Sequence, residues 1–126
     1  MIIIDSNLII YAAEPHRLSL RQAISQESAA VSAISRLETQ GYHSLRQNEI
    51  EFFTAFFAAT LQIAINDEVL DKAIELRQKQ SMSVADAIIA STALLLSAEL
   101  YTRNTKDFDW IPGLKVVNPI DENFPP

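Results

Sequence analysis

The apolar positions of the chain fall into short continuous runs that alternate with longer helical repeats. The first run, Ile2, Ile3 and Ile4, ends at Asp5 and is typical of a central parallel strand buried on both faces. Similar runs predict four further strands, at 29–33, 61–65, 99–102 and 114–117. Asp5 should therefore lie at the carboxyl edge of a central strand, where open α/β sheets bind their ligands.

Between these runs, apolar residues recur at helical spacing. The expected helices lie at 8–13, 18–24, from Ser35 onward, from Asn48 onward, from about 67 to 79, and at 87–98. The last is the most apolar and should be the buried central helix. Alternating strands and helices predict an α/β fold, a three-layer α/β/α sandwich with a central parallel sheet.

One helix carries four phenylalanines on a single face. Phe52, Phe53, Phe56 and Phe57 follow the spacing of one side of the helix that starts at Asn48. Such a face is expected to pack in the core. The alternative is a hydrophobic groove for a partner helix or a second subunit.

The length and composition limit the classes of protein to which this chain can belong. A chain of 126 residues corresponds to a single domain, residues 1–126. There are no cysteines, so disulfides and thiol chemistry are excluded, and the two glycines form no phosphate-binding loop. The start lacks a signal-peptide pattern, and the run 87–98 is too short to span a bilayer. We therefore expect a soluble, cytoplasmic protein with no membrane partner.

The net charge of −6 argues against attraction of nucleic acid by the whole surface. An acidic nuclease remains compatible with this charge if a divalent metal ion neutralises its site. A basic protein partner would also fit.

Four carboxylates occupy equivalent places beside the predicted strands. Asp5 and Asp107 follow the first and fourth strands, while Glu38 and Asp86 are expected in the first turns of two helices. Because crossovers between parallel strands are right-handed, all four should meet at one edge of the sheet.

Each acid also has a purely structural explanation. Glu38 and Asp86 complete capping-box patterns that start at Ser35 and Ser83, Asp5 could cap the next helix, and Asp107 could be a solvated loop residue. As a group, however, carboxylates 4 Å apart repel by about 4 kcal/mol at an effective dielectric of 20, and a cation would offset this. Oxygen ligands favour Mg²⁺ or Mn²⁺ over zinc, and such ions support phosphodiester hydrolysis.

The types and spacing of these residues also match those of a known protein family. The chain resembles the PIN-domain nucleases and, within them, the VapC-like toxins of bacterial toxin–antitoxin pairs. The matching segments keep the family's order and spacing along nearly the whole chain: residues 2–11, 31–38, 76–77, 83–93, 102–108 and 112–116.

The resemblance implies an endoribonuclease that uses Mg²⁺ or Mn²⁺, forms a homodimer and is inhibited by a cognate antitoxin. Asp5, Glu38 and Asp86 match the family's most regular acids. The fourth acid corresponds either to Asp107 or to the position of Asn104, whose carbonyl can coordinate but adds no charge. The implied catalytic set is Asp5, Glu38, Asp86 and Asp107, with Asp5, Asp86 and Asp107 as metal ligands.

Polar neighbours complete the expected site. By the same resemblance Ser6, Asn7, Ser35, Ser83 and Asn104 line or brace the acids. The helix from Asn48 and the helix at 67–79 are expected to form a groove for an amphipathic antitoxin segment.

Two rival functions remain. A haloacid-dehalogenase-like phosphatase would need an acid where this chain has Asn7, which disfavours it. A metal-free PIN-like module that only binds RNA or protein is the non-enzymatic alternative.

Overall fold

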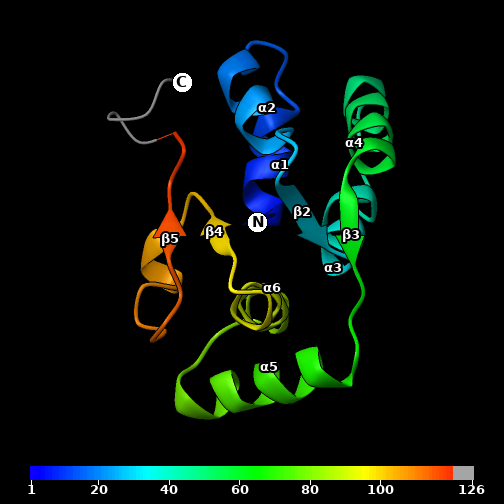
Figure 1. The fold of residues 1–126 in the computed structure, drawn as a ribbon. Helices are drawn as coiled ribbons and strands as arrows, with labels where there is room; N and C mark the ends of the chain where they lie inside the picture. Colours follow the sequence, from blue (N-terminus) through cyan, green and yellow to red (C-terminus); the bar gives the residue numbers. More distant parts are fainter. Residues whose placement is uncertain (121–126) are drawn as a thin grey trace.

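Five parallel strands form one sheet at the centre of the computed structural model, which describes residues 1–120. The strands are β1 (Ile2–Ile4), β2 (Ala29–Ser32), β3 (Leu61–Ile63), β4 (Glu99–Tyr101) and β5 (Val116–Val117). Their order across the sheet is β3-β2-β1-β4-β5 (Figure 1). The central position predicted for β1 is confirmed, as is the parallel sheet.

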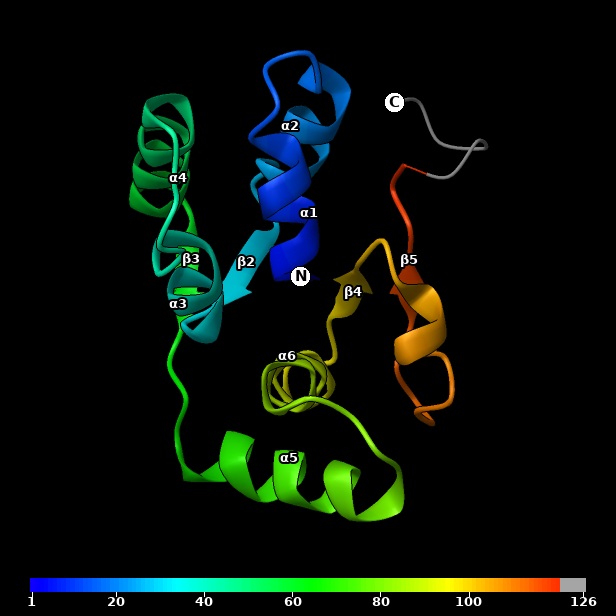
Figure 2. The ribbon, with the colours of Figure 1, turned by 180° about the vertical axis from the view of Figure 1, so that it is seen from behind.

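The helices cover both faces of this sheet. They are α1 (Ser6–Ala12), α2 (Leu18–Ile24), α3 (Ile34–Gln40), α4 (Gln47–Ala59), α5 (Asp67–Lys79), α6 (Val84–Leu95) and the 3₁₀ turn η1 (Thr105–Asp107). Figures 1 and 2 show α1, α2 and α4 on one side, and α6 with α5 beyond it on the other. The predicted three-layer arrangement is confirmed.

The isoleucines of β1 explain why this strand is central. Ile2 and Ile4 pack into the cluster that includes α1, α2 and α4. Ile3 points the other way, into the cluster that includes α6. A strand whose alternate side chains enter two hydrophobic layers must be apolar on both faces.

Within residues 1–120, no helix has the length and apolar character needed to cross a membrane.

The phenylalanine face of α4 is core. Phe53, Phe56 and Phe57 are at most 6% exposed, and Phe52 packs against the same cluster with Arg21 over its ring at 4.3 Å. The groove predicted between α4 and α5 is wrong. The two helices lie on opposite sides of the sheet, so they share no surface (Figure 1).

The two predicted capping boxes have different outcomes. Ser83 caps α6, its hydroxyl accepting from the Asp86 amide at 3.0 Å. The Ser35–Glu38 box is wrong, because α3 starts at Ile34 and Glu38 lies beyond its first turn. Residues three apart on a helix share a face, and here that face makes tertiary contacts instead of a cap.

Candidate active site

Asp5 is the most enclosed of the four acids. It directly follows β1, and its side chain makes no hydrogen bond that caps α1. The residue is only 4% exposed. Its Oδ2 accepts a hydrogen bond of 2.7 Å from the hydroxyl of Thr102. Helix capping therefore does not account for this carboxylate.

Thr102 is a residue of the site that the sequence did not reveal. The pairing of Ile4 with Tyr101 between β1 and β4 brings Asp5 and Thr102 side by side. Besides donating to Asp5, the hydroxyl accepts from the side-chain amide of Asn7 at 3.3 Å and the backbone amide of Asn104 at 3.1 Å. One donor and two acceptor positions are all that a threonine hydroxyl offers, so Thr102 is fully used.

Glu38 is held at the site through a serine pair. The hydroxyl of Ser6 lies 2.7 Å from Glu38 Oε1 and 2.8 Å from the hydroxyl of Ser35. A hydroxyl carries one proton, so Ser6 donates to the carboxylate and accepts from Ser35. Both serines are buried, whereas Glu38 is exposed. The predicted bracing serines thus lie between α1 and α3, with Glu38 at their open end.

The fold places the four acids near enough for their negative charges to interact. Burial, with smaller contributions from the charges of Asp86 and Glu38, raises the pKa of Asp5 to about 6, although the Thr102 hydrogen bond lowers it. Burial also raises the pKa of Asp86, helped by the charges of Asp107 and Glu38. These mutual effects are those expected of like charges that lie near one another.

The fourth position belongs to the loop after β4. A hollow of about 420 Å³ is lined there by residues 103–107. Asn104 is tied to Thr102 through its backbone, while the charge of Asp107 reaches Asp86. Both side chains are exposed. Of the two candidates, Asp107 is therefore the one with an electrostatic link to the other acids.

The donor set suits a hard divalent cation by its chemistry, since every candidate ligand is an oxygen. Within residues 1–120, however, no three acidic or histidine side chains are close enough together to hold a metal ion as they stand. Like charges repel, and Glu38 is engaged by Ser6. An ion that bound here would have to draw the carboxylates closer together.

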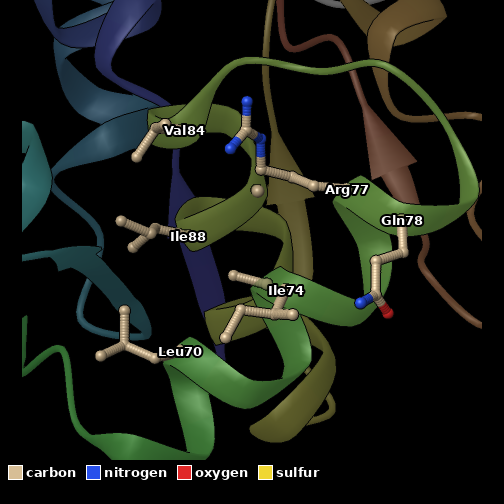
Figure 3. A pocket seen from close by; sticks show the side chains of 8 residues that line it. Leu70, Ile74, Arg77, Gln78, Val84 and Ile88 are labelled. Carbon is tan, nitrogen blue, oxygen red and sulfur yellow. The ribbon is translucent and has the colours of Figure 1, made fainter.

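A second hollow in the described structure is lined by none of these acids. It measures about 470 Å³ and lies between α5 and α6, where Leu70, Ile74 and Val84 are exposed (Figure 3). Its lining is mainly apolar, with Arg77 at one side. This α5–α6 groove is a surface separate from the four acids.

Comparison with known proteins identifies the family. The sequence profile of the PIN domain matches residues 2–114. The chain belongs to the PIN domain family. The resemblance to PIN-domain proteins seen in the sequence is thereby confirmed. A search of curated protein sequences gave no match to this PIN domain.

Solved structures place the PIN domain beside VapC-like proteins. A toxin–antitoxin complex from Klebsiella pneumoniae contains a chain that is 31% identical, with a TM-score of 0.74 over 96% of this chain and 99% of that one. VapBC2 from Rickettsia felis, bound to a promoter DNA fragment, gives 26% identity and 0.78 over 94% and 98%. DNA-bound VapBC from Salmonella typhimurium is 17% identical with a TM-score of 0.79 over 92% and 96%, a likeness of fold alone.

Proposed function

We propose that this PIN domain is a Mg²⁺- or Mn²⁺-dependent endoribonuclease, the toxin of a toxin–antitoxin pair. The observation that carries the proposal is the convergence of Asp5, Glu38, Asp86 and Asp107 from four separate parts of the chain. A buried carboxylate such as Asp5 lowers stability unless hydrogen bonds or a cation compensate its charge. The metal-free binding module offers no use for it, so the enzyme is the favoured function.

The four acids have separate roles in this proposal. Asp5, Asp86 and Asp107 would hold the metal, which when bound supplies positive charge against the phosphate and lowers the pKa of water. Glu38 accepts from Ser6 through Oε1, which leaves its other oxygen to take a proton from the attacking water. Asn7 and Thr102 keep Asp5 oriented, and Ser6 with Ser35 orient Glu38. Ser83 positions the first turn of α6 from which Asp86 projects, and Asn104 is the alternative fourth ligand.

The proposed partners are the RNA substrate, a cognate antitoxin and a second copy of the chain. Complexes of toxin with antitoxin among the structural neighbours support the antitoxin. The exposed apolar side chains of the α5–α6 groove support a contact with another protein, and we assign this contact to the second copy of the chain. Ile74→Asp should then convert a dimer to a monomer in light scattering, while an unchanged mass would place the contact elsewhere.

The function is tested by cleavage of a labelled single-stranded RNA with Mg²⁺, Mn²⁺ or EDTA. Asp5→Ala, Glu38→Ala and Asp86→Ala should each lower the divalent-dependent rate at least about a hundredfold, since metal-binding sets act as units. Asp71→Ala, an exposed acid on α5, is the matched control and should cleave normally. Cleavage by Asp5→Ala at the wild-type rate would contradict the assignment. RNA binding without cleavage by the wild type would favour the binding module.

A further inference from the structure

Two arginines cover the ring of Tyr11. The guanidinium carbon of Arg17 lies 3.7 Å from the ring centroid, and that of Arg103 lies 3.9 Å from it. Two groups this close to one centroid cannot share a face, so they occupy opposite faces of the ring. Tyr11 is half-buried and packs against the core, which fixes the plane on which both cations rest. We call this arrangement the Arg17–Tyr11–Arg103 stack.

The stack is built on the same residues that orient Asp5. Tyr11 lies one turn along α1 from Asn7, on the same face of the helix. Arg103 follows Thr102 directly. Its backbone amide donates a hydrogen bond of 3.4 Å to Asn7 Oδ1. The side chain of Asn7 donates to Thr102 in turn. The positive stack and the acidic crevice therefore share Asn7 and Thr102 as a common frame.

The two arginines differ in how their charge is compensated. Arg17 pairs with Glu14 at 3.3 Å. Arg103 is exposed, and among residues 1–120 no acidic group lies within ion-pair distance of it, nor does its guanidinium donate a hydrogen bond. Lys106, in the same loop, also makes no ion pair with a described residue. Their donors are free for an anion from outside the chain.

We propose that the Arg17–Tyr11–Arg103 stack, with Lys106, binds the backbone phosphates of the RNA that flank the bond to be cut. This inference rests on the proposed nuclease function and extends it to the path of the substrate. A chain of net charge −6 needs local cations to hold RNA beside four carboxylates. The planar guanidinium suits bidentate contact with phosphate, and stacking on Tyr11 reduces the freedom that Arg103 loses on binding.

Binding can be measured apart from cleavage. We would titrate a fluorescein-labelled single-stranded RNA in EDTA, follow anisotropy, and repeat the titration at several KCl concentrations. Arg103→Gln should weaken binding about tenfold, as for loss of a charge-assisted contact. The slope of log K against log salt should become shallower by about 0.7, the value for one phosphate contact on a single strand.

Three further variants separate charge, stacking and folding. Arg103→Lys keeps the charge and loses the planar stack, so it should retain the salt slope and only part of the affinity. Arg17→Gln should weaken binding less, because Glu14 already compensates Arg17. Lys79→Gln removes one exposed positive charge from α5, on the far side of the sheet, and should bind as the wild type does (Figure 2). Circular dichroism melting checks that each variant is folded.

The possible results bear on different claims. Equal affinity and slope for Arg103→Gln and Lys79→Gln would overturn the inference. So would displacement of the RNA by poly-L-glutamate at equal charge concentration, because the stack would then be a general anion surface. A wild type that binds RNA through Arg103 and cleaves none with Mg²⁺ or Mn²⁺ would overturn the nuclease function and leave the stack as the RNA contact.

Discussion

The hydroxyl of Thr102 donates a 2.7 Å hydrogen bond to Asp5 Oδ2 across 97 residues of sequence. The same hydroxyl accepts from Asn7 and from the backbone of Asn104. One uncharged side chain thus joins the end of β1, the start of α1 and the loop after β4. The orientation of Asp5 depends on it.

Removing the Thr102 hydroxyl should lower the stability of the fold even when the replacement side chain has nearly the same shape. Thr102→Val leaves one carboxylate oxygen and two amide donors without their partner in a buried site, and we expect the free energy of unfolding to fall by about 1–3 kcal/mol. The pKa of Asp5 should rise further, because the Thr102 hydrogen bond lowers it. Urea denaturation and carboxyl NMR titration measure the two effects. Thr102→Ser keeps the hydroxyl and should resemble the wild type; equal behaviour of both variants would contradict the role of the hydrogen bond.

The raised pKa of Asp5 predicts a pH dependence of stability without metal. The folded chain keeps the Asp5 proton to a pKa of about 6, whereas the unfolded chain releases it near the ordinary carboxyl pKa of 3.8. Between these values the unfolded state binds fewer protons, so the free energy of unfolding falls as pH rises, by about 3 kcal/mol in total. In the Asp5→Asn variant, the free energy of unfolding should not fall in this way as the pH rises.

Urea denaturation in EDTA between pH 4 and 7 tests the difference between the two proteins. The variant should match the wild type near pH 4 and exceed its stability above pH 6. Asp71→Asn is the exposed control and should follow the wild type throughout. Parallel curves for the wild type and Asp5→Asn would contradict the shifted pKa.

Divalent metal should stabilise the folded protein. Binding to the native state alone adds about 2.7 kcal/mol when the metal is at a hundred times its Kd. Mg²⁺ or Mn²⁺ should therefore raise the Tm of the wild type, and Asp86→Asn should reduce the rise. The same variant should be at least as stable as the wild type in EDTA, because a charge that raises repulsion in the crevice is gone. No response of the wild-type melting curve to Mn²⁺ would count against a metal site.

The fourth ligand can be assigned by comparing two alanine variants. Asp107→Ala should lower RNA cleavage and raise the Mg²⁺ concentration needed for half-maximal rate more than Asn104→Ala does. The reason is that Asp107 brings a negative charge that couples to Asp86, whereas an amide brings none. The Mg²⁺ dependence of the two variants measures this. A larger effect of Asn104→Ala would reverse the assignment.

The core position of α4 predicts what a charge there would do. Phe56→Asp places a carboxylate at a site that is 6% exposed and removes an aromatic from the cluster, so the chain should unfold or lose several kcal/mol of stability. Thermal melting by circular dichroism measures it. Ile50→Asp changes an exposed residue of the same helix and should leave the Tm nearly unchanged. If the Phe56→Asp protein folded with normal stability, the phenylalanine face of α4 would again be a candidate binding surface.

Local pattern was enough for much of the fold. The run Ile2–Ile4 carries its own signal, because only a strand between two helical layers must be apolar on both faces. The apolar length of α6 likewise predicted a buried helix. From these elements the edge at which Asp5 lies followed by topology alone.

The sequence failed where contacts between distant segments decide the outcome. Ser35 and Glu38 have the spacing of a capping box, yet both are engaged by Ser6. Thr102 lies in a segment that matches the family, but the local pattern does not mark its side chain as part of the site, and the pairing of β1 with β4 places it beside Asp5. Such residues become visible once the strand order is known.

The place of β4 beside β1 also sets when the crevice can exist during synthesis. On the ribosome, β1 is made first and can pair with β2 after some 30 residues. Its other edge stays unpaired until residues 99–101 have emerged, and only then does Thr102 reach Asp5. A chain that stops before that point has three of the four acids and no strand to gather them. The proposed active site is thus one of the last parts of the molecule to form, and incomplete chains should be inert.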